Sequence, residues 1–328
     1  MKKTILVTGG AGYIGSHTVY ELVQQGYHVV VIDNFVYNQP WPFVGVQLER
    51  GSIADTALLE RVFSSYDVEC VMHFAAFIEV GQSVLDPQRF YENNVVNSLN
   101  LLNAMVRCNV TQFIFSSSCA VYGNPQYLPL NEEHVFEPQS PYGKNKLMVE
   151  YALQDYAHAY GIRFVSLRYF NAAGAAVDHN LGEWHEPETH IIPNVMRAAL
   201  KDKELTVFGV DYETLDGSCI RDYVHVFDIA QAHVRAYTYL SAGGVSNVFN
   251  VGTGRGFSVL ELIAAAERVV EKKIRVLHAP RRAGDVPILV ADNAKITREL
   301  GWRACYSTLD TMCSSAFAWE KRRLNHGT

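Results

Sequence analysis

The sequence lacks the features of secreted, membrane-spanning and metal-clustered proteins. Its 328 residues contain no apolar run long enough to cross a bilayer. Lys2 and Lys3 precede an apolar run, but this run soon breaks into glycines and fits a strand better than a signal peptide. Cysteines are few and show no CxxC spacing, which suits reduced thiols in the cytoplasm, not a disulfide frame or a zinc site. The six are Cys70, Cys108, Cys119, Cys219, Cys305 and Cys313.

An excess of positive charge, repeats and low-complexity tracts are also absent. The net charge of −6 argues against a general nucleic-acid binder, so an anionic substrate would have to meet a few well-placed arginines. With 48% hydrophobic and 19% charged residues, the chain has the composition of a globular enzyme without a membrane partner. Its length suffices for a single large domain or for two of ordinary size.

What the sequence does contain is a glycine-rich turn near its start. The apolar residues 5–7 are followed by Gly9, Gly12 and Gly15, which is the order of a strand, a tight turn and a helix start. In dinucleotide-binding folds the first glycine permits the turn, the second lets the backbone approach a pyrophosphate, and the third lets helix and strand pack closely. The helix N-terminus then offers N–H groups and a positive dipole end to the phosphates. A plain glycine turn is the simpler interpretation, but this position in the chain favours a dinucleotide site.

Asp33 identifies the expected dinucleotide. It ends a run at residues 28–33 that reads as the second parallel strand. A carboxylate there accepts hydrogen bonds from both ribose hydroxyls of adenosine and repels a 2′-phosphate. No arginine or lysine follows between Asn34 and Glu49. We therefore expect NAD rather than NADP; the alternative is a solvated aspartate in a turn.

Strand and helix patterns alternate through the first half of the chain, which predicts an α/β fold with a doubly wound parallel sheet of the Rossmann type. We expect an NAD-binding domain over residues 1–171. Residues 172–328 are less regular and predict a smaller mixed α/β lobe, mainly for the substrate, with some segments returning to the first domain. The expected helices are 13–25, 90–106, 142–160 and one from the Ser258/Glu261 capping box to Val270; the expected strands include 28–33, 70–74, 112–117 and 163–168.

Tyr142 and Lys146 form a second motif, after a strand that ends in Ser116, Ser117 and Ser118. Residues four apart share one face of a helix. A phenol has a pKa near ~10, and a lysine ammonium and an oxidised nicotinamide both favour its ionised form; lowering the pKa to about 7 takes roughly 4 kcal/mol. With Ser118 bonding the same substrate hydroxyl, this pattern predicts acid–base chemistry coupled to hydride transfer. Ordinary helix-surface residues are the alternative.

Together these motifs resemble the extended short-chain dehydrogenase/reductase superfamily. Five further segments are similar to the UDP-glucose 4-epimerase family within it, and the resemblance covers almost the whole chain. They are Pro-Tyr-Gly-Lys-Asn-Lys (141–146), Tyr-Phe-Asn-Ala-Ala-Gly (169–174), Pro-Glu-Thr-His-Ile-Ile-Pro (187–193), Asp-Gly-Ser-Cys-Ile-Arg-Asp-Tyr-Val-His-Val (216–226) and Arg-Arg-Ala-Gly-Asp (281–285).

The resemblance implies reversible C4 epimerisation of UDP-glucose and UDP-galactose, as part of galactose metabolism. Tyr142 would take the proton of the sugar 4-hydroxyl while the C4 hydride passes to NAD. The transient 4-keto sugar would turn while held only at UDP, and enzyme-bound NADH would return the hydride to the other face. NAD would be retained through each turnover. A homodimer through residues 90–106 and 142–160 is also implied.

The same resemblance assigns roles to individual positions. The implied catalytic residues are Ser118, Tyr142 and Lys146. The implied cofactor-binding residues are Gly9, Gly12, Tyr13, Ile14, Gly15, Asp33, Asn34, Ser52, Ile53, Phe74, Ala75, Ala76, Asn94, Ser116, Tyr142, Lys146 and Phe170. The implied substrate-binding residues are Ser118, Tyr142, Asn171, His190, Ile191, Thr206, Phe208, Arg221, Arg282, Asp285 and Leu289. Among these, Arg221 and Arg282 suit the diphosphate as guanidinium partners.

Leu289 stands where the family limits the room beside the C2 substituent of the sugar. Its intermediate size predicts a preference for plain hexoses over N-acetylhexosamines, although a core leucine is the alternative. Three departures concern the adenosine side. Ser52 stands where the family usually has an aspartate, Ile78 stands where many members have a lysine, and residues 35–46 are shorter and lack the usual helix.

No metal is expected. His185, Glu186 and His190 imitate a metal motif, but their spacing is wrong and Pro187 would break the helix that such a site needs.

Three other functions remain as alternatives. A sugar-nucleotide 4,6-dehydratase would carry an Asp-Glu pair where this chain has Cys119 and Ala120. An epimerase of uronic or N-acetylated sugars would share the main motifs. A non-catalytic dinucleotide sensor would keep the glycines but would not need Ser118, Tyr142 and Lys146 together.

Overall fold

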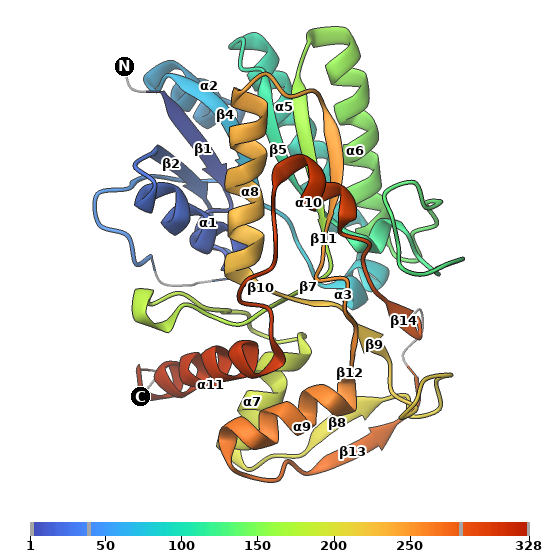
Figure 1. The fold of residues 1–328 in the computed structure, drawn as a ribbon. Helices are drawn as coiled ribbons and strands as arrows, with labels where there is room; N and C mark the ends of the chain where they lie inside the picture. Colours follow the sequence, from blue (N-terminus) through green and yellow to red (C-terminus); the bar gives the residue numbers. More distant parts are fainter. Residues whose placement is uncertain (1–2, 38–40, 282–284, 327–328) are drawn as a thin grey trace.

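A parallel sheet of seven strands forms the centre of the protein, and a smaller lobe lies at one end of it (Figure 1). The computed structural model describes residues 3–37, 41–281 and 285–326. Across the sheet the strands are β11 (Asn247–Val251), β6 (Arg163–Tyr169), β5 (Gln112–Ser118), β4 (Val68–His73), β1 (Thr4–Thr8), β2 (His28–Asp33) and β3 (Gln47–Arg50). All of the neighbouring pairs are parallel, which confirms the predicted Rossmann-type sheet.

Helices cover both faces of this sheet, so its central strands are buried on both sides and read as continuous apolar runs. In β1, Ile5 and Val7 point into the core on one face and Leu6 into the core on the other. The first face packs against α1 (Tyr13–Gln24), α8 (Val226–Ser241) and α10 (Ala294–Leu300). The second packs against α2 (Thr56–Ser65), α5 (Asn97–Arg107) and α6 (Pro141–Tyr160).

The helix expected over residues 90–106 is interrupted. The structure has α4 (Pro87–Tyr91), then a π-helical turn, η1 (Glu92–Val96), and then α5. This turn holds Asn94, whose side-chain oxygen accepts from the N–H of Phe77 and whose amide donates to the Phe77 carbonyl. A π-turn inserts one residue into the helix and rotates the face that follows. Of the predicted core face, Leu102 is fully buried, whereas Tyr91, Val95 and Leu99 are only half-buried.

The helix that carries the Tyr-x-x-x-Lys motif is confirmed as α6. Ser140 caps it by accepting from the N–H of Gly143, and Pro141 is its first residue. Gly161 ends it at a φ of 71°, in the left-handed region that favours glycine. This helix runs alongside β5, from the carboxyl end of that strand, and it therefore sets the position of Tyr142 relative to Ser118.

The smaller lobe has its own core of buried side chains, among them Val195, Met196, Leu262 and Met312. Its helices are α7 (Ile191–Lys201), α9 (Val259–Val270) and α11 (Leu309–His326). The predicted capping box at the start of α9 is confirmed. Its strands pair as β13 (Val276–Ala279) with β8 (Leu205–Phe208), as β10 (Tyr223–His225) with β7 (Asn171–Ala173), and as β12 (Phe257–Ser258), β9 (Ile220–Arg221) and β14 (Ile288–Leu289).

The chain passes between the two parts several times. After the first lobe segments, β11 joins the central sheet and α8 and α10 pack on it; α11 then lies in the lobe (Figure 1). The remaining short elements are α3 (Val80–Leu85), η2 (Cys119–Val121) and η3 (Val177–His179).

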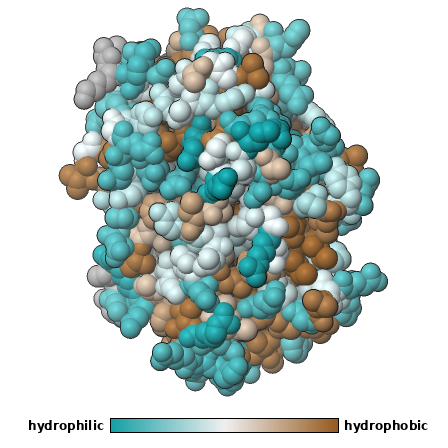
Figure 2. Space-filling model, in the orientation of Figure 1, coloured by the Kyte–Doolittle hydropathy of each residue, from teal (hydrophilic) through white to brown (hydrophobic). Residues whose placement is uncertain are grey.

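Hydrophilic residues cover most of the face drawn in Figure 2, with hydrophobic residues in smaller groups between them. Among the described residues, no helix combines the length and the apolar character that a membrane span requires.

Candidate active site

The glycine-rich turn connects β1 to α1 at the carboxyl end of the sheet. Gly9 has a φ of +72°, and a Cβ there would lie 2.6 Å from the Ala75 nitrogen. A Cβ on Gly15 would lie 2.2 Å from the Gly9 carbonyl oxygen, so only glycine lets the helix pack this closely. At Gly12 the same atom would meet only the Gly9 oxygen, at 3.3 Å. Gly12 is also the N-cap of α1, and no side chain caps this helix. The first N–H groups of α1 are therefore available to an anion.

Asp33 lies beside this turn, at the end of β2. One carboxylate oxygen accepts from the Ala11 N–H at 2.9 Å and the other from the Phe35 N–H at 2.7 Å. Burial raises the pKa of Asp33, and these two hydrogen bonds oppose the rise. Asn34 next to it is exposed, and its side chain accepts from the Val36 N–H.

The other proposed cofactor residues follow β3 and β4. Ser52 is half-buried and accepts from the Ala54 N–H, while Ile53 is in the core. Phe74, Ala75 and Ala76 are half-buried. The N–H groups of Phe74 and Ala75 donate to the Thr8 carbonyl, which holds the end of β4 against the glycine turn. The strand order reverses between β1 and β4, the point where dinucleotide folds form their binding crevice.

Tyr142, Lys146 and Ser118 come together at the carboxyl end of β5. The Ser118 hydroxyl lies close enough to the Tyr142 phenol to favour its ionised form and so to lower its pKa. Lys146 is 4% exposed, its Nζ donates to the Ser116 carbonyl at 2.7 Å, and it lies 5.7 Å from the centre of the Tyr142 ring. The backbone N–H of Tyr142 donates to the Ser83 hydroxyl of α3 at 3.2 Å. The proposed acid–base group is therefore fixed from two sides.

The electrostatics of this pair differ from the expectation. Burial raises the pKa of Tyr142 to about 12; the Ser118 hydroxyl opposes the rise, and Cys119 and Glu79 add to it. Burial also lowers the pKa of Lys146 to about 7, against the nearby Glu150. A lysine whose pKa is near 7 is only partly charged at neutral pH, so it favours the phenolate less than a full cation would. The residues of the site do not by themselves lower the pKa of Tyr142.

The proposed substrate residues lie on the lobe and on its strands next to the sheet. Leu289 in β14 pairs in register with Arg221 in β9, and Leu289 packs against a buried cluster that includes Cys119 and Phe170. Arg221 lies 4.0 Å from the Asp285 carboxylate. Arg282 lies outside the described residues. The remaining members are Asn171 in β7, His190 and Ile191 at the start of α7, and the exposed Thr206 and Phe208 in β8.

Two acidic residues near this site were not predicted from the sequence. Asp222 is fully buried and accepts hydrogen bonds from Thr253, Gly254 and the N–H of Ala291, which ties the segments that carry Arg221 and Leu289 together. Asp222 directly follows Arg221 in the family-like segment 216–226, and this position could have indicated its importance. Glu79 accepts from the Tyr37 hydroxyl at 3.0 Å, and no sequence pattern pointed to it.

Comparisons with known proteins agree with this geometry. Residues 5–252 match the family described as "NAD dependent epimerase/dehydratase family". The UDP-glucose 4-epimerase of Rhizobium meliloti is 49% identical over 326 residues, which cover 98% of each chain. The crystal structure of UDP-glucose 4-epimerase from Brucella ovis in complex with NAD superposes with a TM-score of 0.91 at 46% identity, covering 96% of this chain and 97% of that one. The Bifidobacterium longum UDP-glucose 4-epimerase in complex with NAD+ and UDP gives a TM-score of 0.90 at 38% identity, over 98% and 99% of the chains.

Proposed function

The chain belongs to the NAD dependent epimerase/dehydratase family and, within it, to the UDP-glucose 4-epimerases, and on this basis we propose how its residues interconvert UDP-glucose and UDP-galactose. The observation that carries the proposal is the convergence of Tyr142, Lys146 and Ser118 at the sheet end beside the glycine turn. The reaction inverts C4 of the sugar, so it needs one group that takes and returns a proton at the 4-hydroxyl.

Tyr142 is the proposed acid–base residue. Its oxygen takes the proton of the 4-hydroxyl as the 4-keto sugar forms and gives it back when C4 is reduced from the other side. Ser118, whose hydroxyl lies next to this phenol, orients the same substrate hydroxyl. Because burial raises the pKa of Tyr142 to about 12, the phenolate must be favoured by positive charge near it.

Lys146 is proposed to orient and polarise the site. The hydrogen bond from its Nζ to the Ser116 carbonyl fixes the ammonium behind the Tyr142 ring. An ammonium has three donors, so two remain for the ribose hydroxyls next to the nicotinamide. Its lowered pKa keeps part of the population neutral at pH 7, so proton exchange through Lys146 needs little free energy.

The residues present fit NAD. Gly12 and the uncapped start of α1 suit a pyrophosphate, and each Asp33 oxygen has a further lone pair for a ribose hydroxyl. Asn94, a further proposed cofactor residue, forms two hydrogen bonds with the Phe77 backbone. When bound, NAD accepts hydride from C4 of the sugar, returns it, and in its oxidised form adds a positive ring beside Tyr142.

UDP is proposed to be the part of the substrate that stays fixed. Arg221 offers its guanidinium to the diphosphate, and Arg282 is proposed as a second cation there. Asn171, His190, Ile191, Thr206, Phe208 and Asp285 are proposed to complete the UDP-sugar site. Tight binding at UDP leaves the 4-keto sugar free to turn about its phosphate linkage, which explains inversion at C4.

A 4,6-dehydratase remains the weaker candidate because the residues after Ser118 are Cys119 and Ala120. Neither can act as the acid–base pair that water elimination needs, and burial raises the pKa of the Cys119 thiol to about 12.

We also propose that the protein is a cytoplasmic homodimer. In each chain, residues 1–171 would bind NAD, and residues 172–328 would mainly bind the UDP-sugar, with some segments returning to the first domain. The helical pair of η1–α5 and α6 supports the dimer, because Val96, Met148 and Tyr151 are 50%, 44% and 48% exposed on these elements. Apolar side chains of this kind on two neighbouring helices suit a helix-on-helix interface.

The experiment that tests the function is an NMR time course of the purified protein with UDP-galactose and no added cofactor. The anomeric signal of UDP-glucose should grow to a fixed ratio, denatured protein should release NAD, and no net NADH should accumulate. A reaction that consumes NADH or NADPH and yields a reduced sugar would refute the proposal. A rate that rises when NAD is added would indicate that the protein retains NAD weakly. The departures from the family at Ser52 and Ile78, on the adenosine side, would account for such weak binding.

A further inference from the structure

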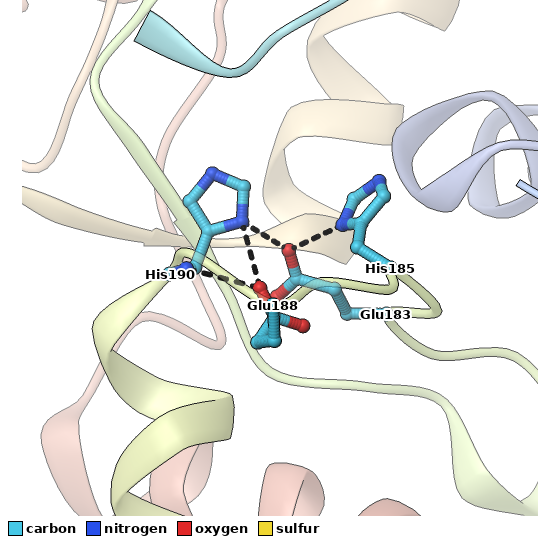
Figure 3. Close-up of side chains that lie close together, drawn as sticks. All are labelled: Glu183, His185, Glu188 and His190. Atoms are coloured by element: carbon cyan, nitrogen blue, oxygen red, sulfur yellow. Dashed lines mark hydrogen bonds and ion pairs between the residues drawn. The ribbon is translucent and has the colours of Figure 1, made fainter. Parts of the chain in front are cut away.

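The segment between β7 and α7 gathers four metal-ligating side chains outside the catalytic group of Tyr142 and Lys146. Glu183, His185, Glu188 and His190 point toward one another from one loop (Figure 3). Their nearest ligand atoms all lie within 4.8 Å of one another. The sequence analysis rejected a metal site made of His185, Glu186 and His190. In the structure, the Glu186 side chain is 72% exposed and pairs with Arg323, so it is not part of the group. Glu183 and Glu188 complete the group instead.

The distances within the group suit a small ion. The Nδ1 atoms of both histidines contact the same oxygen of Glu183, at 3.1 Å for His185 and closer for His190. The Nδ1 atom of His190 lies 3.5 Å from the Glu188 carboxylate. Four ligands at the usual zinc–nitrogen and zinc–oxygen lengths of about 2.0–2.2 Å are separated by roughly 3.4 Å along a tetrahedron edge. To surround one ion, the ligand atoms in direct contact would move apart, and any pair as far apart as 4.8 Å would approach by about 1.4 Å.

The charges of the group favour a cation at its centre. The side chains of Glu183 and Glu188 are 5% and 1% exposed, so two carboxylates are held away from water. Arg197 is the guanidinium next to Glu188, at 3.4 Å, but it also pairs with Glu320 at 3.1 Å. A buried carboxylate needs a paired cation or a metal. Without an ion, Glu183 pairs with His185 and His190, and Glu188 pairs with Arg197 and accepts from two backbone N–H groups. A divalent ion would replace these histidine–glutamate contacts and balance both carboxylates, while the histidines bind it as neutral imidazoles.

The surroundings hold these ligands in position, as the outer contacts of a metal site do. The N–H groups of Thr189 and His190 both donate to one Glu188 oxygen at 2.9 Å, and Arg197 contacts the other. The Trp319 indole donates to the Glu183 carbonyl at 2.8 Å and fixes that part of the loop.

We propose that Glu183, His185, Glu188 and His190 bind one divalent transition-metal ion of the zinc class. Two imidazoles and two carboxylates form a donor set that prefers Zn²⁺ and similar ions over Mg²⁺ or Ca²⁺, which take oxygen ligands. Coordination uses Nδ1 of each histidine. The second ring nitrogen of His190 points away from the glutamates (Figure 3) and stays available to the substrate. The site is structural: it fixes the loop that leads into α7, beside the proposed UDP-sugar residues.

The test measures metal binding directly, without reference to turnover. Untagged protein is treated with a chelator, desalted and titrated with Zn²⁺. Unbound zinc is then removed by a second desalting step, and the bound zinc is measured by mass spectrometry of the metal. One equivalent of zinc per chain is expected to remain. His185→Gln and Glu183→Gln should raise the Kd for zinc more than about a hundredfold, because changes to outer contacts alone cost ten- to a hundredfold. The control is His158→Gln, which removes an exposed histidine at the end of α6 and should leave zinc binding unchanged.

Cobalt gives a second measurement on the unmodified chain, in case a variant fails to fold. Co²⁺ in a tetrahedral site of nitrogen and oxygen ligands absorbs strongly in the visible range, and Zn²⁺ should displace it. Absence of a retained equivalent in the wild type, or equal zinc retention in His185→Gln, would overturn the proposal and leave a network of ion pairs at this loop. Such a result would not affect the epimerase function, which the UDP-galactose time course tests on its own.

Discussion

Tyr142 and Lys146 share one face of α6, but burial shifts their pKa values in opposite directions. Burial raises the pKa of the phenol to about 12 and lowers that of the amine to about 7. Each residue is therefore biased toward its neutral form before NAD and substrate bind. The spacing in the sequence was enough to pair the two residues, but it could not give these pKa shifts, because they depend on burial in the folded protein.

Replacing Tyr142 by Phe removes the proposed proton acceptor and leaves the ring in place. We expect kcat to fall on the order of a hundredfold or more, the usual scale for a positioned acid–base group. Affinity for UDP, measured by calorimetry, should barely change because the residues proposed to bind UDP lie on the lobe. Tyr127→Phe, which changes a 46% exposed tyrosine outside the proposed site and dimer helices, is the matched control and should keep wild-type turnover. Near-normal turnover of Tyr142→Phe would remove this residue from the mechanism.

Lys146 gives a pH-dependent contribution to stability. Its pKa in the folded protein, about 7, is below its ordinary value of 10.5, so between these pH values the unfolded chain binds the extra proton. The free energy of unfolding then rises with pH by at most about 1.4 kcal/mol per unit, and this gain is lost as the pH falls to 7. In urea melts of NAD-free protein, the stability of wild type minus that of Lys146→Met should increase from pH 7 to pH 9.5. A difference that stays constant over this range would contradict the shift.

Among the elements, the strand–turn–helix at the start of the chain was the most predictable. Three glycines served three different geometric purposes, and each purpose is visible in the contacts that a Cβ would make. The π-turn at η1 could not be predicted in this way. Its sequence continues an ordinary helical pattern, and the reason for the extra residue is tertiary: Asn94 must reach the Phe77 backbone. The short strands of the lobe, such as β9 and β14, exist only because they pair with each other.

Gly12→Ala tests whether the glycine-rich turn before α1 binds the pyrophosphate of NAD without disturbing the fold of the turn. The new Cβ would lie 3.3 Å from the Gly9 oxygen, so the turn should accept it with a small shift, but it would project into the expected path of the pyrophosphate. Overfilling of this kind costs about 1–3 kcal/mol, which corresponds to a ten- to hundredfold weaker affinity. The NAD content of purified protein should fall while far-UV circular dichroism is unchanged. Gly81→Ala, with no atom within 4 Å of its Cβ, is the control; equal NAD content in both variants would argue against a pyrophosphate at Gly12.

At the scale of the whole molecule, the parallel sheet and the existence of a second lobe followed from the sequence, while the path between them did not. Alternating strands and helices dictate the sheet, but α8, β11 and α10 join it only after the chain has visited the lobe. Nothing in their local sequence distinguishes them from lobe elements, because burial against α1 and β6 is decided by tertiary packing. The proposed active site combines residues of these two parts, so its sugar-binding residues could be predicted only through the family resemblance.

A substitution of Leu289 tests the proposed preference for plain hexoses. It comes from the lobe strand β14, yet it packs beside Phe170 and Cys119 at the end of the central sheet. A packed wall resists an acetamido group by ~1–3 kcal/mol, so UDP-glucose and UDP-galactose should be preferred roughly ten- to hundredfold over their N-acetylated counterparts. Leu289→Ser should raise kcat/KM for the acetylated pair relative to the plain pair. Equal wild-type values, or a ratio that mutation leaves unchanged, would show that Leu289 is only a core residue.

The central claim is that C4 is inverted by removing its hydrogen and returning the same hydrogen to the opposite face. The most direct measurement uses UDP-galactose labelled with deuterium at C4, in ordinary water with catalytic amounts of protein, and follows the label in UDP-glucose by NMR and mass spectrometry. The account predicts that UDP-glucose forms with deuterium retained at C4, because the proton handled by Tyr142 is the one on the oxygen. Loss of the label to solvent, or UDP-glucose with solvent hydrogen at C4, would contradict it.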